Sequence, residues 1–134
     1  MEEKRPRPRT RPARGRLQSM RVSSGFRDFV LDQLAGVRGL RAKAMFGGVG
    51  LYSGDVFFGI LAADLLYFKV GDANRDEYEQ AGSKPFRPYA DRAMKMPYYN
   101  VPIATLEDAV SVVAWAERAI AAAKATQSNR KKKT

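Results

Sequence analysis

The sequence predicts an α+β domain, in which an antiparallel β-sheet is packed by helices from near both ends of the chain. Apolar residues recur at helical spacing near each end, and short strand-like runs lie between them. Tight turns join those runs, which favours an antiparallel meander over alternating strands and helices. With 134 residues, of which 45% are apolar, the chain is long enough for one domain with a real core.

The first helix is predicted to begin after Ser23 or Ser24, because either hydroxyl can cap the free N–H groups of a first turn. Gly36 and Gly39 are expected to close this helix. Its apolar face consists of Phe26, Phe29, Val30, Leu34 and Val37.

Three extended segments follow, at residues 41–52, 56–61 and 65–70. Turn residues at 53–55 and 62–64 separate them. Strand-like runs joined by such short turns are typical of consecutive hairpins, so we expect neighbouring antiparallel strands here.

The first extended segment contains a cluster of glycines at positions 47, 48 and 50. A phosphate-binding loop would need Gly-Lys-Ser/Thr at its end, whereas Leu51-Tyr52 follows here. A dinucleotide-binding turn would lead into a helix, whereas a further strand is predicted. Glycines within a strand more often mark a bulge or a close approach of two backbones, so we interpret the cluster as structural.

A short polar helix is predicted at residues 72–80, with Asp72 or Asn74 as its cap and Gly82 at its end. After a loop, a short strand is predicted at residues 93–96. These elements complete the sheet before the last helix begins.

The last helix is predicted from Thr105 to about Lys124, with Glu107 and Asp108 in its first turn, where negative charge suits the helix dipole. Apolar residues cover much of its circumference, so it is expected to contact more than one neighbour. We favour packing on the sheet and on the first helix. The alternative is a dimer interface that uses Trp115.

The chain contains neither cysteine nor histidine. Disulfides, Cys- or His-ligated zinc sites, thiolate nucleophiles and Ser-His-Asp triads are therefore excluded. The carboxylates are scattered, and none forms a metal-binding or general-acid pair by spacing. We therefore expect no enzyme activity, no catalytic residue, no cofactor and no metal.

The net charge of +10 lies almost entirely outside the predicted domain. Residues 1–21 contain eight basic and two acidic residues, and residues 124–134 contain five basic residues. Residues 22–123 contain eleven basic and twelve acidic residues and are nearly neutral. We predict a disordered basic arm at 1–21, a folded domain at 22–124 and a disordered basic tail at 125–134.

The two basic segments are candidates for non-specific DNA binding, because Arg and Lys neutralise phosphates and release counterions. The candidate residues are Arg5, Arg7, Arg9, Arg11, Arg14, Arg16, Arg130, Lys131, Lys132 and Lys133. Arg14-Gly15-Arg16 resembles the core of an AT-hook, which reads A·T-rich minor grooves, although Leu17 stands where that motif has proline. The alternatives are an inert solubilising segment or a natural start at Met20.

Strand alternation places Tyr67 and Lys69 on the sheet face opposite their apolar neighbours. An aromatic residue beside a cation suits a nucleic acid or a peptide, although a solvated sheet face is the favoured interpretation. Arg41, Lys43, Arg92 and Lys95 would extend this patch if their strands neighbour it.

A series of motifs resembles, in order and spacing, the N-terminal domain of the TfoX (Sxy) family over about residues 24–124. The motifs are Met45-Phe46-Gly47-Gly48-Val49-Gly50-Leu51-Tyr52, Phe58-Gly59, Leu66-Tyr67-Phe68-Lys69-Val70, Asn74-Arg75, Ala81-Gly82-Ser83, Pro85-Phe86, Met96-Pro97-Tyr98-Tyr99-Asn100-Val101-Pro102 and Ala114-Trp115-Ala116. The resemblance implies that motif residues determine the fold, with the glycines shaping a strand bend and the Tyr-Tyr-Pro residues fixing the approach to the last helix. These fold residues are Met45, Phe46, Gly47, Gly48, Gly50, Tyr98, Tyr99, Pro102 and Trp115.

The resemblance further implies a sheet backed by helices, similar to the secretion-chaperone architecture. Two-domain members regulate natural competence together with a cyclic-AMP-responsive transcription factor, and 134 residues leave no room for their second domain. We therefore expect a single-domain, cytoplasmic, non-enzymatic regulatory or adaptor module, monomeric or homodimeric, without a membrane segment. Its expected partner is a protein, such as a transcription factor or an RNA polymerase component, with DNA affinity added by the basic tails. The alternative is a dimeric module that binds a peptide or small ligand, with inert tails.

Overall fold

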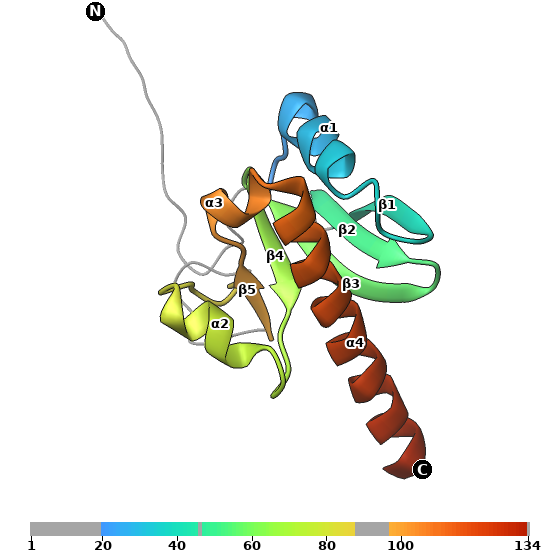
Figure 1. Ribbon diagram of the computed structural model, residues 1–134. Coiled ribbons are helices and arrows are strands. Elements are labelled where there is room, and N and C mark those ends of the chain that lie inside the picture. Colours follow the sequence, from blue (N-terminus) through green and yellow to red (C-terminus); the bar gives the residue numbers. More distant parts are fainter. Residues whose placement is uncertain (1–19, 46, 88–96, 134) are drawn as a thin grey trace, which may run out of the picture.

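The computed structural model describes residues 20–45, 47–87 and 97–133, with side chains described as far as residue 127. These residues form an antiparallel sheet with helices packed against it (Figure 1), which confirms the predicted α+β class. The elements in chain order are α1 (Ser24–Gln33), β1 (Leu40–Met45), β2 (Gly48–Ser53), β3 (Val56–Ala62), β4 (Leu65–Lys69), α2 (Arg75–Gln80), β5 (Tyr98–Asn100), α3 (Ile103–Leu106) and α4 (Ala109–Lys133).

The strands lie in the sheet in the order in which they occur in the chain, and every neighbouring pair is antiparallel. The predicted hairpins are thus confirmed. The turn between β3 and β4 contains Ala63 and Asp64, both in the left-handed region with φ of 53° and 58°. Asp64 Oδ1 accepts a hydrogen bond from the Ser23 N–H at 2.7 Å, so this turn also fixes the start of α1.

The glycine cluster lies where β2 leaves β1 and approaches β3. Gly47 adopts the left-handed region with φ of 81°. A Cβ on Gly48 would collide with the carbonyl oxygen of Leu61 on β3. The β2–β3 register shifts between Leu51 and Tyr52, which is a β-bulge. The glycines therefore allow close approach of two backbones rather than contact with a phosphate.

The main core lies between one face of the sheet and the helices. α4 runs diagonally across this face and contacts β3, β4, α3 and α1 (Figure 1). These several neighbours explain why its apolar arc is wide. Phe58, Phe68 and Val112 are among the fully buried side chains, and each stabilises the fold by about 1.5–3 kcal/mol through the surface it removes from water.

A second cluster covers part of the opposite sheet face. Met20, Ile60, Ala62, Phe86 and Tyr98 are buried there. The segments around Met20 and Phe86 therefore cover part of the sheet face around Tyr67, for which a solvated surface is the favoured prediction. Strand alternation identified the two faces but contained no information about which loops would return across one of them.

The last helix differs from its prediction at both ends. It is divided into α3 and α4, because Asp108 Oδ1 accepts hydrogen bonds from the N–H groups of Val110 at 3.1 Å and Ser111 at 3.4 Å and so caps a new helix. At the other end α4 continues to Lys133, although a disordered tail is predicted from residue 125. Residues 125–133 lack Gly and Pro, and six of these nine residues are Ala, Gln, Arg or Lys, which are strong helix formers.

Of the predicted caps of α1 and α2, the first is confirmed and the second is not. Ser23 caps α1 as predicted, by accepting a hydrogen bond from the Phe26 N–H at 3.2 Å. Asn74 does not cap α2, because its amide bonds the Gly71 N–H and the Lys69 carbonyl instead. The strand predicted at 93–96 lies outside the described residues.

The glycine geometry generates a paired stability prediction. Gly48→Ala is expected to lower the free energy of unfolding by about 1–3 kcal/mol, because the new methyl group forces β2 away from β3. Gly25→Ala is the matched control, since the space around Gly25 in α1 is open and alanine favours a helix by about 0.5–1 kcal/mol. Urea unfolding measures both changes. Equal stability of the Gly48→Ala and wild-type proteins would contradict the close approach.

Candidate binding surfaces

The described part of the chain contains no group of three or more side chains that could hold a metal ion. Burial raises the pKa of Tyr78 far above its ordinary value of 10.0, the neighbouring Glu77 raises it further, and Arg118 partly opposes the shift. The Tyr78 hydroxyl therefore stays protonated and does not act as a base at neutral pH.

Tyr78 belongs to an aromatic contact that joins α2 to α4 and β5. Its ring lies edge-on to Trp115, with centroids 4.7 Å apart, and 6.1 Å from the ring of Tyr99. Glu77 accepts two hydrogen bonds from Arg118, at 2.9 and 3.0 Å, beside this contact. Trp115 thus packs against α2, a neighbour that the prediction of packing on the sheet and the first helix did not include.

The family-motif residues lie at joints between elements. Met45 ends β1 and its side chain covers Gly50. Tyr98 and Tyr99 lie on β5, with Tyr98 directed to the second cluster and Tyr99 to the main core. Pro102 immediately precedes α3. Phe46 lies outside the described residues.

The predicted DNA-binding residues are placed only in part. Arg5, Arg7, Arg9, Arg11, Arg14 and Arg16 lie outside the described residues, as do Arg92 and Lys95. Arg130 to Lys133 lie in the last turns of α4, where the backbone alone is described.

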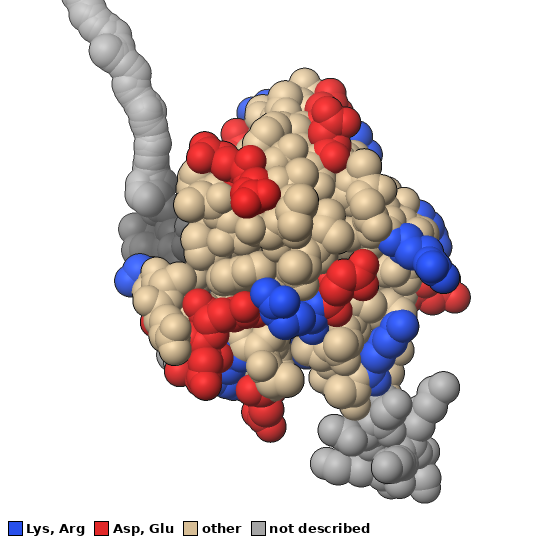
Figure 2. Space-filling model, viewed as in Figure 1, with Lys and Arg blue, Asp and Glu red and all other residues tan. Residues whose placement is uncertain are grey.

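Four large apolar side chains are exposed on α1, at the start of β4, on α3 and at the start of α4, elements that lie at the same end of the molecule. They are Phe29, Leu65, Ile103 and Val110, with exposed fractions of 40, 39, 62 and 82%. We call this surface the apolar end. It lies at the top of Figure 1, and Figure 2 shows acidic side chains beside an uncharged surface there, with Lys and Arg side chains at the edges.

The helices at the apolar end are held by defined polar contacts. Gln33 Nε2 donates a hydrogen bond to the Leu106 carbonyl at 2.8 Å, which fixes α1 beside α3. The Asp108 cap fixes the start of α4, next to Val110. The exposed apolar side chains therefore project from a rigid support, and exposed apolar patches of this kind commonly mark interaction sites.

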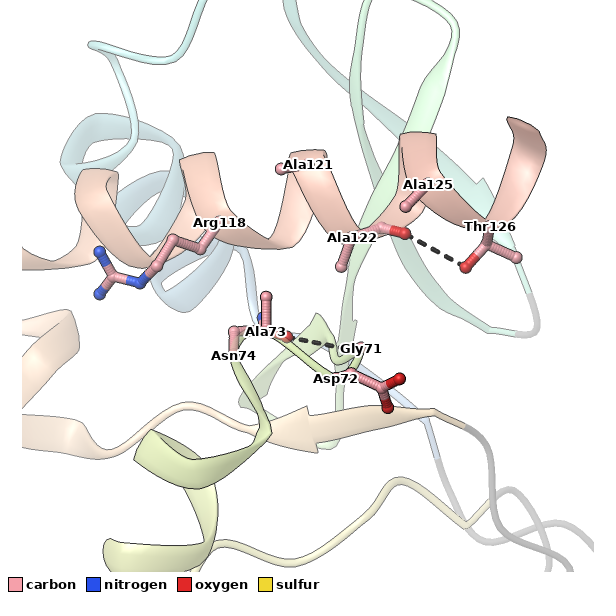
Figure 3. A pocket seen from close by; sticks show the side chains of 9 residues that line it. All are labelled: Gly71, Asp72, Ala73, Asn74, Arg118, Ala121, Ala122, Ala125 and Thr126. Carbon is pink, nitrogen blue, oxygen red and sulfur yellow. Dashed lines mark hydrogen bonds between the residues drawn. The ribbon is translucent and has the colours of Figure 1, made fainter. Parts of the chain in front are cut away.

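A groove of about 450 Å³ lies between α4 and the connection from β4 to α2 (Figure 3). Most of its lining residues are small, and its polar groups are already bonded. Asn74 Oδ1 accepts from the Gly71 N–H at 2.7 Å, and Thr126 Oγ1 donates to the Ala122 carbonyl at 3.1 Å. The residues of the groove are Gly71, Asp72, Ala73, Asn74, Arg118, Ala121, Ala122, Ala125 and Thr126.

Aromatic rings form a row across the sheet face that is opposite the helices. Tyr52 and Phe57 have centroids 5.2 Å apart, and Phe57 and Tyr98 have centroids 5.4 Å apart. The Arg41 guanidinium carbon and the Lys43 Nζ lie 5.8 and 6.0 Å from the Tyr52 centroid, which is cation–π distance.

The patch predicted around Tyr67 and Lys69 is therefore rearranged. Arg41 and Lys43 do share that face, but they lie beside Tyr52, whereas the ring of Tyr67 packs on Phe86 at 5.0 Å. Lys69 lies over the ring of Tyr98 at 5.5 Å. Sequence reasoning missed Tyr52 and Phe57, because their pairing depends on the bulge between β2 and β3.

Comparison with protein families matches residues 32–123 to the TfoX N-terminal domain. The chain belongs to this family. The match covers most of the chain and includes every strand of the described sheet. A comparison with curated proteins gave no match. Among the described residues of this TfoX N-terminal domain, no helix combines the length and apolar character needed to cross a membrane.

The aromatic contact between α2 and α4 generates a stability prediction. The Tyr78 hydroxyl is buried and has no hydrogen-bond partner among the described residues. Tyr78→Phe is therefore expected to raise the free energy of unfolding by about 1 kcal/mol at neutral pH, because an unpaired polar group is removed from the core. The single tryptophan, Trp115, reports urea unfolding by its fluorescence.

The same variant has a signature in alkali. Because the folded-state pKa of Tyr78 is raised, its ionisation favours the unfolded chain. The free energy of unfolding is therefore unaffected by this group below pH 10.0 and falls as the pH rises above that value. Wild-type stability is therefore expected to fall more steeply above pH 10.0 than that of Tyr78→Phe. Parallel pH profiles of the two proteins would argue against a buried, protonated hydroxyl.

Proposed function

We propose that this TfoX N-terminal domain is a non-enzymatic regulatory or adaptor module that acts in transcription regulation through a protein partner. Its basic segments add non-specific DNA affinity. The observation that carries the proposal is the apolar end, where 62% of Ile103 and 82% of Val110 are exposed on rigidly held helices. Family membership also supports it.

The chemistry of the apolar end favours a particular class of partner. Acidic residues outnumber basic ones on the same elements. Arg27 on α1 is accompanied by Asp28 and Asp32 on α1, Asp64 in the β3–β4 turn, and Glu107 and Asp108 before α4. Charge complementarity at the rim of an interface steers association and excludes wrong partners. The proposed partner therefore presents an apolar face flanked by Lys or Arg.

The basic segments are proposed to act on a different partner. Residues 1–21 and 124–134 together contain thirteen basic residues, whereas residues 22–123 are nearly neutral. Counterion release gives such segments affinity for any duplex, with strong dependence on salt. The module would thereby hold its protein partner close to DNA in the cytoplasm.

A second candidate function is the binding of a small ligand or peptide in the groove of Figure 3. Its volume of about 450 Å³ falls within the range typical of small-molecule sites. Its polar groups are bonded within the chain, however, so it offers few groups that would orient a ligand. We therefore rank this function below the protein-binding one.

Site-specific photo-crosslinking in cells tests the protein partner. A photoreactive phenylalanine in place of Val110 is expected to give a dominant adduct with a component of the transcription machinery, because this side chain points out of the apolar end. The same substitution at Glu117, an exposed position further along α4, is the control. Adducts of equal yield at both positions, or none at Val110, would count against the apolar end as the interface.

DNA binding by the arm is tested with a labelled duplex over a salt series. In the full chain, Arg5, Arg7, Arg9, Arg11, Arg14 and Arg16 are changed together to Gln. The wild-type log–log salt slope is expected to show about −0.9 per phosphate contact, and the variant to show a shallower slope. Preference for A·T-rich duplex would support the minor-groove interpretation of Arg14-Gly15-Arg16. An unchanged slope in the variant would leave the arm without a role in DNA binding.

A further inference from the structure

We propose that the sheet face formed by Arg41, Lys43, Tyr52 and Phe57 binds single-stranded nucleic acid. We call this surface the aromatic–basic face. The inference goes beyond the proposed function, which assigns DNA affinity to the basic segments alone and requires no contact with a base.

A glycine leaves the space in which the two aromatic rings of this face pack together. Gly50 lies on β2 beside Tyr52, and a Cβ there would meet Phe57 Cε1 at 3.1 Å and the end of the Met45 side chain still closer. The missing side chain lets Phe57 lean from β3 across β2 towards Tyr52, with which it forms a tilted pair at 5.2 Å. Both rings remain partly exposed. Partly exposed rings that are fixed in this way can stack on unpaired bases without losing side-chain freedom.

The cations of the face are placed by the β1–β2 register. Arg41 is paired with Tyr52 and Lys43 with Gly50, so both basic side chains lie next to the rings. Both are exposed, and their charged groups lie within 6.0 Å of the Tyr52 centroid. Asp55 is the nearby carboxylate, 3.6 Å from Arg41. This ion pair is solvent-exposed, and such pairs are weak, so a phosphate can compete for Arg41.

The aromatic row continues to the projecting end of α4. A small cavity of about 140 Å³ is lined by Phe57, Lys69 and Tyr98 from the sheet side and by residues 123, 126 and 127 of α4. α4 then runs beyond the sheet (Figure 1), and its last turns contain Arg130 and three lysines in sequence. Figure 2 shows further Lys and Arg side chains on the flank of the molecule next to this end of α4. A nucleic-acid strand that stacks on the rings can therefore continue towards the end of α4, whose sequence is basic.

The combination of groups favours a single strand over a duplex or a protein. Stacking on Tyr52 and Phe57 requires bases whose faces are free, and a duplex hides these faces. Arg41 and Lys43 favour a ligand with regularly spaced negative charge, and the basic end of α4 prolongs that preference along one direction. An acidic protein would satisfy the cations but would leave the aromatic pair unused.

Fluorescence anisotropy of the full-length chain with a labelled oligothymidylate of about 16 nucleotides tests the proposal. Tyr52→Leu is expected to weaken binding about fivefold or more, because it removes the stacking surface and keeps an apolar side chain. Tyr52→Phe retains the ring and is expected to bind like the wild type. The unfolding midpoint by Trp115 fluorescence shows whether each variant is folded.

A second pair of variants separates local from overall charge. Arg41→Gln with Lys43→Gln removes two charges from the aromatic–basic face, and Arg27→Gln with Lys84→Gln removes two exposed charges from α1 and from the segment after α2. Only the first pair is expected to weaken oligothymidylate binding severalfold beyond the effect of net charge. This pair decides the question if Tyr52→Leu does not fold.

Two results would overturn the inference. One is equal weakening by both pairs of charge variants, which would indicate non-specific attraction. The other is unchanged oligothymidylate affinity in a folded Tyr52→Leu protein. A duplex of the same length distinguishes this inference from the proposed role of the arm, because arm substitutions are expected to act on the duplex and Tyr52→Leu is not.

Discussion

The close packing of α4 on the sheet is the constraint on which the other elements depend. Ala116 and Ala119 of α4 are fully buried, and a Cβ on Gly71 would lie 3.3 Å from Ala122. Small residues at these positions let the helix lie close to the sheet and to the connection that follows β4. Trp115 and Arg118 of α4 contact α2, and Val113 lies against Gly36, three residues after α1. One helix thus positions elements from both halves of the chain.

This packing buries most of the large apolar side chains. Two surfaces of different chemistry stay exposed on the described part of the chain. The apolar end is formed where helices meet, and acidic residues accompany it. The aromatic–basic face is formed on the other side of the sheet, where strand alternation presents the rings and cations. Because different elements build the two surfaces, a partner at one does not cover the other. An adaptor that joins a protein to a nucleic acid needs this separation.

Local patterns predicted the parts of the fold that local physics decides. The Ser23 cap, the hairpins and the helical periodicity depend on neighbours in sequence. The fold class follows from the order of these elements. Asp108 is predicted in a first turn but caps α4, because a carboxylate in a first turn and one at an N-cap look alike in sequence. Asn74 bonds the Gly71 N–H and the Lys69 carbonyl, which are brought together by the turn that follows β4. The pairing of Tyr52 with Phe57 follows from a bulge, and a one-residue shift in register would place Phe57 on the opposite face.

β1 stands at one end of the strand order and is paired on one side only among the described residues. Its outer row of backbone N–H and C=O groups is therefore a template on which another copy of the chain could continue the sheet. Arg41 and Lys43 project from this strand, and in a second copy aligned along the edge the same charges would approach each other. Their mutual repulsion would oppose growth of the sheet between molecules. The two cations would thus disfavour self-association through this edge, whatever ligand they bind.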